Sequence, residues 1–266
     1  MDKFTKLVTE IGKLWSKYGN SYLTGIQNTL ILALAATAIG CIIGFACGIL
    51  NTIPCSKNDP LPKRILLKLV RIIVRVYVEV FRGTPMVLQA VFIYYGLPYF
   101  TDNALKFTNM WVAALVVVSV NTGAYMAEIV RGGIISIDKG QFEGAQALGM
   151  SHLQIMCHIV LPQVIRNILP SVSNEFIINI KDTSVLNVIG VTELYFYAGK
   201  IKLFNLQIFQ TYFVVCVLYF ILTFSISRLL RLAERKLDGK ENYTICGSQS
   251  DFNAEIHVQE ESPSCR

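Results

Sequence analysis

The sequence predicts an all-α membrane protein with about five spanning helices. Of its 266 residues, 53% are hydrophobic and only 16% are charged, whereas a soluble domain carries about 25% charged residues. Its apolar runs are long enough to cross a bilayer, which takes about 20 residues. Basic residues gather after alternate runs. This composition excludes an ordinary soluble enzyme, a nucleic-acid-binding module and a disordered tail protein.

The first expected span, Tyr22–Leu50, contains no charged residue. Small residues recur in it at four-residue intervals and therefore share one stripe of a helix: Ala36, Gly40, Gly44 and Gly48. Such a stripe allows another helix backbone to approach closely within the membrane. Residues 1–21 are interpreted as an extracytoplasmic or interfacial segment preceding a transmembrane domain over residues 22–236.

A basic segment follows a proline-rich loop over residues 51–63. Arg64, Lys68, Arg71 and Arg75 fall on one helical face, with apolar residues around the rest. This pattern predicts a helix in the cytoplasmic interface, with its basic side toward anionic lipid headgroups. The alternative is the first half of a spanning helix whose arginines reach back to the interface.

Four further spans complete the expected bundle. The second, about Pro85–Phe100, is short, so its helix is expected to begin earlier, through Tyr77–Phe81. The others are Asn109–Val130, the more polar Val164–Ile189, and Ile208–Leu230. Residues 237–266 are charged, rich in Ser and poor in large apolar groups, which predicts a disordered cytoplasmic tail.

Charge sets the expected orientation. The basic stretches Arg64–Arg75, Arg131–Arg166 and Arg228–Lys236 all lie on one side of a five-span arrangement. The positive-inside rule makes that side cytoplasmic. The N-terminus is therefore expected outside, against the four lysines that precede the first span, and the C-terminus in the cytoplasm.

The connection over residues 131–163 carries the most functional information. Small residues would leave a short helix here without bulky side chains: Gly140, Gly144, Ala145 and Gly149. Glu143 adds one fixed charge beside them. Gly149 permits a sharp turn at the helix end, and Pro162 is expected to set the start of the next helix. This predicts a rigid helix held in a groove of another protein; the alternative is a plain interhelical loop.

This connection resembles the signature of permease subunits of bacterial ABC importers, Glu-Ala-Ala-x3-Gly-x9-Ile-x-Leu-Pro. It matches at Glu143, Ala145, Gly149, Ile159, Leu161 and Pro162. Gly144 replaces the usual alanine, which keeps the residue small and weakens the helix by about 1 kcal/mol. Four further stretches resemble the polar amino-acid branch of these permeases, of histidine, glutamine or arginine type: Glu79–Pro85, Gly96–Pro98, Ala124–Ile134 and Lys181–Leu186.

The resemblance implies a type I ABC importer transmembrane domain with about five spans and a cytoplasmic coupling helix. It implies a second permease subunit, identical or paralogous, two separate ATPase subunits and an extracytoplasmic solute-binding protein that delivers an amino acid. ATP and Mg²⁺ would bind the ATPase, in agreement with the lack of a GxxxxGK[ST] motif here. The coupling residues implied are Gly140, Glu143, Gly144, Ala145, Gly149, Ile159, Leu161 and Pro162. No catalytic residue, cofactor, metal site or nucleic-acid partner is expected.

Passage of a zwitterionic amino acid requires polar groups within the spans, where such groups are costly and usually functional. Four candidates lie at mid-depth: Gln89, Asn121, Asn174 and Glu175. Glu175 could meet a substrate ammonium or a cationic side chain. The alternative for each is a hydrogen bond to a neighbouring helix. Lys181 and Asp182 are interpreted as structural, either paired with another span or marking a helix break.

Three other functions remain open at this point. The same architecture could carry an opine or an amine. A stand-alone channel or secondary transporter would predict inverted repeats, and none is evident. A membrane enzyme would need a catalytic group of side chains, and the histidines and cysteines are scattered.

Overall fold

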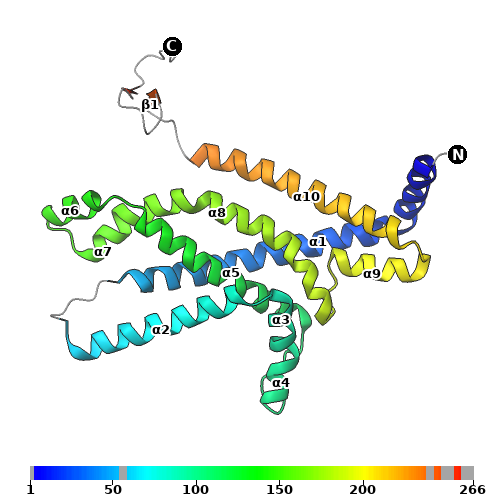
Figure 1. The fold of residues 1–266 in the computed structure, drawn as a ribbon, viewed down its shortest axis with the longest axis horizontal. Coiled ribbons are helices and arrows are strands. Elements are labelled where there is room, and N and C mark those ends of the chain that lie inside the picture. Colours follow the sequence, from blue (N-terminus) through cyan, green and yellow to red (C-terminus); the bar gives the residue numbers. More distant parts are fainter. Residues whose placement is uncertain (1–2, 54–58, 238–242, 247–254, 259–266) are drawn as a thin grey trace.

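The computed structural model describes residues 3–53, 59–237, 243–246 and 255–258. Long helices run side by side as a bundle (Figure 1). Four of the described helices are long and apolar enough to cross a membrane, and the shorter Met86–Phe100 is apolar too. The predicted all-α class is confirmed, and the four long helices contain four of the five apolar runs expected to span the membrane.

Helices α1 (Lys3–Thr52) and α5 (Met110–Ile135) form the centre of the bundle. The small-residue stripe of α1 faces α5. A Cβ placed on Gly40 would lie 2.7 Å from the Cβ of Thr122, and one on Gly48 would lie 2.6 Å from a methyl carbon of Val130. The close approach of the two helices therefore depends on these glycines, as the four-residue spacing predicted.

Residues 3–21 are helical and continuous with the first expected span, as the first part of α1. With a rise of 1.5 Å per residue, α1 is about 75 Å long, more than twice a bilayer core of about 30 Å. Its first turns pack against α10 (Ile208–Leu237), where Gln210 Nε2 donates to Glu10 Oε2 over 2.6 Å. Leu14 is buried in the same contact.

The second span is broken, and the expectation of one helix running on from Tyr77–Phe81 is wrong. Helix α2 (Leu61–Gly83) ends at Thr84, and α3 (Met86–Val91) begins after Pro85. Both linking residues are extended, with ψ of 144° and 134°. Proline disfavours helical backbone in the residue before it, which explains the break at this point.

Helix α2 runs alongside α1 (Figure 1), and its buried Val74 and Val78 pack with Ala127 of α5. A helix lying flat in the interface would instead cross the spans. The arrangement favours the alternative interpretation, in which the basic helix is the first half of the second span. The second half continues from α3 through the π-helical turn η1 (Phe92–Gly96) into α4 (Leu97–Phe100).

The 131–163 connection contains two short helices. They are α6 (Lys139–Ala147) and α7 (His152–Ile155), and α7 continues through the π-helical turn η2 (Met156–Val160) into α8 (Leu161–Asp182). Pro162 lies in the first turn of α8, as predicted, although α8 follows α7 and η2 without an intervening loop. Proline lacks an N–H and crowds the carbonyl of the preceding turn. A widened turn just before it accommodates both effects, and η1 stands in the same place before Pro98.

At the opposite end from α6 (Figure 1), α8 gives way to the 3-10 helix η3 (Thr183–Ile189) and then to α9 (Leu194–Asn205). At Asp182 the helix tightens from α to 3-10 geometry without leaving the helical region, so the helix break considered for Lys181 and Asp182 stays a prediction. Beyond α10, the structure describes an antiparallel pair of short strands, β1 (Tyr243–Cys246) and β2 (Glu255–Val258). The other tail residues for which disorder was predicted lie outside the described part of the chain.

Candidate functional site

Helix α6 is held by local caps at both ends. The Asp138 carboxylate accepts the Gly140 N–H over 2.6 Å at its start. At its end Gly149 has φ +77°, and the Met150 N–H donates to the Ala145 carbonyl over 3.1 Å. This is a Schellman ending, which glycine favours because the left-handed backbone carries no side-chain penalty. The predicted short helix with a sharp glycine turn is confirmed.

The residues of the resemblance motif divide between two faces. Ala145 is 4% exposed and packs in a core with Val160 and Val164, and Ile159 and Leu161 lie half-buried against the same core. The other motif residues are exposed: Gly140, Glu143, Gly144, Gly149 and Pro162.

A Cβ on Gly144 or Gly149 would meet nothing within 4 Å. Packing within this chain therefore does not explain why Gly144 is small. The buried residues hold α6 against the bundle, whereas the exposed ones form a surface without bulky side chains that faces away from the bundle.

Two leucines beside this surface were not singled out from the sequence. Leu148 is 84% exposed and Leu153 is 72% exposed, on either side of the turn between α6 and α7. Neither contributes to a described core. The available sequence signal was the position of these two leucines on either side of Gly149. We define the docking face as Gly140, Glu143, Gly144, Leu148, Gly149 and Leu153.

Of the four passage candidates, Gln89 and Asn121 are joined to each other. Asn121 Nδ2 donates to Gln89 Oε1 over 3.0 Å, and Gln89 Nε2 donates to the Phe81 and Thr84 carbonyls over 2.8 and 2.9 Å. Both side chains are buried. They satisfy carbonyls that the end of a helix leaves without partners, and so brace the break between α2 and α3.

A second buried polar cluster was missed by the sequence analysis. Asn179 Nδ2 donates to Thr37 Oγ1 over 2.8 Å and to Thr122 Oγ1 over 2.9 Å, joining α8 to α1 and α5. All three residues are less than 9% exposed. A buried polar group needs such partners. Asn179, in the more polar fourth span, was the available signal.

Asn174 and Glu175 are placed differently. Asn174 is exposed and Glu175 is half-buried. Within the described residues, neither side chain makes a hydrogen bond or ion pair. The charged residues that interact electrostatically with Glu175 are Asp182 and Arg82. The interhelical hydrogen bond that was the alternative role is absent for these two side chains in the described chain.

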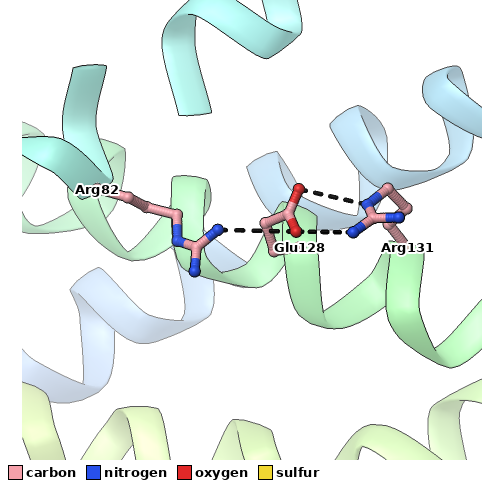
Figure 2. A network of polar contacts seen from close by, with 3 residues as sticks. All are labelled: Arg82, Glu128 and Arg131. Carbon is pink, nitrogen blue, oxygen red and sulfur yellow. Dashed lines mark hydrogen bonds and ion pairs between the residues drawn. The ribbon is translucent and has the colours of Figure 1, made fainter. Parts of the chain in front are cut away.

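Figure 2 shows an ion-pair network that joins two of the stretches singled out from the sequence. Glu128 of α5 accepts two hydrogen bonds from Arg131, of 2.9 and 3.3 Å. Arg82, near the end of α2, approaches Glu128 to 3.6 Å and lies over the Tyr125 ring. The network links α2 to α5 beside the helix break.

At the other end of the bundle, Glu193 is buried and caps α9. Its carboxylate accepts the N–H groups of Tyr195 and Phe196 and the hydroxyl of Tyr219, over 2.6 to 2.8 Å. Burial raises the pKa of Glu193, and these three hydrogen bonds oppose the rise. Through these hydrogen bonds the Glu193 carboxylate links the start of α9 to Tyr219 of α10.

The family model for binding-protein-dependent transport system inner membrane components matches residues 64–239. The chain is 36% identical over 215 residues to the glutamine transport system permease protein of Escherichia coli K12, covering 81% of this chain and 92% of that protein. It is 32% identical over 251 residues to the octopine transport system permease protein of Rhizobium radiobacter, covering 92% and 97%.

Among solved structures, an amino acid ABC transporter with histidines aligns with a TM-score of 0.72 at 33% identity. The alignment covers 83% of this chain and 96% of that one. The MetNI methionine ABC transporter shares the fold, with a TM-score of 0.59 at 19% identity.

Proposed function

Since the chain belongs to the family of binding-protein-dependent transport system inner membrane components and is the permease subunit of an amino-acid ABC importer, we propose that it couples to its ATPase through the docking face. Members of this family work with ATPase and binding-protein partners as multi-pass proteins of the cytoplasmic membrane. We further propose an assembly of two permease subunits, identical or paralogous, with two ATPase subunits. In this assembly α6 lies in the cytoplasm and the N-terminus lies outside.

The observation that carries the coupling role is the exposed face of α6. Gly144 and Gly149 have open space around them, and Leu148 is 84% exposed. A large exposed apolar side chain beside small residues suits a groove in a partner protein. Closure of the ATPase subunits on ATP would then push α6 as a rigid body and shift the spans between two states.

The coupling role is tested by adding bulk on the docking face. Gly149 is unsuitable because its φ of +77° would strain any other residue. Gly144→Leu meets nothing within 4 Å inside this chain, and Gly199→Leu in α9 is a matched control with the same open surroundings. We expect both variants to insert normally, and only Gly144→Leu to lose ATPase copurification and substrate-stimulated ATP hydrolysis. Normal hydrolysis in Gly144→Leu would refute this role.

For the substrate, we propose a polar amino acid, with glutamine as the first ligand to test. The similarity to a glutamine permease supports this choice, and the octopine permease gives the opine alternative weaker support. Asn174 and Glu175 are the proposed passage residues, whereas Gln89 and Asn121 brace the break between α2 and α3. Ligand-binding measurements on the cognate solute-binding protein would decide the substrate, and binding of an opine but not glutamine would contradict the proposal.

A further inference from the structure

A cleft of about 560 Å³ lies between the end of α1, α2 and the last part of α5. We call it the basic cleft; its lining residues are Asn51, Arg71, Arg75, Val78, Glu79, Arg82, Glu128 and Arg131. Four guanidinium groups face two carboxylates there, which leaves an excess of two positive charges. The end of α1 and the start of α2 lie at the same end of the bundle as α6 (Figure 1).

The inner guanidinium groups of the cleft already have a carboxylate partner within this chain. Arg82 and Arg131 share the Glu128 carboxylate, as Figure 2 shows. Both of these guanidinium groups therefore have an acceptor, although one carboxylate does not balance the charge of two arginines.

The outer guanidinium groups are not neutralised. Arg75 makes no hydrogen bond or ion pair within the described part of the chain. Arg71 donates from Nη2 to the Ile53 carbonyl at the end of α1, and its Nε is buried without an acceptor. A buried donor without a partner is unfavourable. Two neighbouring cationic groups with unused donors call for an anion that accepts several hydrogen bonds.

A second hollow, of about 660 Å³, lies along α2 and shares Arg71 and Arg75 with the cleft. Arg64 and Lys68 add positive charge to it, and Ile65 and Ile72 are exposed beside them. Further along α2, Leu69, Ile73 and Val76 are also more than half exposed. Charge and apolar surface are therefore adjacent, which suits an amphiphile with an anionic head and an acyl chain.

We propose that Arg71 and Arg75 bind the phosphate of an anionic phospholipid, with the acyl chains on the exposed apolar side of α2. Guanidinium groups bind phosphate oxygens through paired, charge-assisted hydrogen bonds. This assignment depends on the proposed orientation in one respect only: the orientation decides which leaflet supplies the lipid. It goes beyond the general attraction of a basic helix to the membrane because it identifies one site and two residues that hold the headgroup.

The experiment uses the assembled transporter with its ATPase subunits. It is reconstituted in vesicles of phosphatidylglycerol and phosphatidylcholine, extracted in detergent, and examined by native mass spectrometry for retained phosphatidylglycerol. Arg71→Gln/Arg75→Gln removes both charges. Arg231→Gln, an exposed arginine on α10, is the matched control. Arg71→Lys/Arg75→Lys keeps the charge and removes the planar fork.

We expect the Gln double variant to retain phosphatidylglycerol about tenfold less well than the parent. The Lys double variant should lie between them, and Arg231→Gln should match the parent. Equal retention by the parent and the Gln variant in intact complexes would overturn the site. The Lys variant keeps this test available if the Gln variant does not assemble.

Two further arms identify the source of the anion. Inorganic phosphate and glycerol phosphate are added to the lipid-loaded complex, and displacement of the lipid by either at millimolar concentration would overturn the lipid in favour of a soluble phosphate. Loss of the ATPase subunits from the Gln variant with lipid retention unchanged would overturn it in favour of an acidic partner segment. Both outcomes are independent of whether α6 docks the ATPase or which amino acid is carried.

Discussion

Hydrogen bonding separates the polar residues of the spans into two groups. Gln89, Asn121 and Asn179 are buried, and every one of them bonds another helix or a helix end. Asn174 and Glu175 make no such bond in the described chain and are more exposed. A side chain already used to join helices cannot rearrange around a passing solute without losing those bonds, so the second group is the better candidate for the passage.

Glu175→Gln tests the passage directly. The change keeps the shape of the side chain and removes its charge. If the carboxylate meets a cationic substrate, uptake of arginine should fall about tenfold more than uptake of glutamine, which corresponds to about 1.4 kcal/mol. The measurement is uptake of both amino acids normalised to the amount of assembled complex. Equal losses for both substrates, or no loss, would remove Glu175 from the passage.

For Asn179 we predict a change in stability, in contrast to the change in uptake predicted for Glu175. Asn179→Leu should destabilise the permease by about 1–3 kcal/mol, because the Thr37 and Thr122 hydroxyls lose their partner in a buried site. Thermal unfolding of the purified complex measures this, with exposed Asn167→Leu in the same helix as control. An unchanged midpoint for Asn179→Leu would show that the hydroxyls find other partners.

At the scale of single elements, prolines explain where the helices depart from regular geometry. Pro85 breaks the second span, and Pro98 and Pro162 each follow a π-helical turn. The break at Pro85 is the one that Gln89 and Asn121 stabilise. Helix α6 is the opposite case, because local caps and a left-handed glycine define its two ends without help from the bundle.

Leu148 and Leu153 provide the prediction for α6. Leu148→Ser/Leu153→Ser should leave insertion and thermal stability unchanged, because both side chains are largely exposed. Each leucine buried in a partner contributes about 1.5–3 kcal/mol, so ATPase binding to the permease should weaken at least tenfold. Copurification at graded ATPase concentrations measures this, with exposed Leu203→Ser on α9 as control. Unchanged binding would place the ATPase contact elsewhere.

At the scale of the whole molecule, the long described helices form one bundle with α6 and α7 at one end and α9 at the other (Figure 1). The distribution of Lys and Arg predicts that the α6 end is cytoplasmic. The exposed turn between α9 and α10 then faces outward. Here Leu203, Phe204 and Leu206 are each more than 70% exposed.

Cysteine labelling tests this orientation. In a chain whose native cysteines are replaced by serine, Ser151→Cys should stay unlabelled by an impermeant maleimide on intact cells and react after lysis. Phe204→Cys should be labelled on intact cells. Strong labelling of Ser151→Cys before lysis would invert the predicted topology.

The sequence by itself determined the fold class, the positions of four of the spans, the α1 stripe and the turn at Gly149, and its motifs indicated the family. These features depend on local propensity and helical periodicity, which are properties of neighbouring residues. Tertiary structure decided that Gln89 and Asn121 pair, that Asn179 joins α8 to α1 and α5, that Arg82 meets Glu128, and that α2 packs against α5. Each depends on which side chains from distant segments meet, and helical spacing fixes the face of one helix without specifying its neighbour.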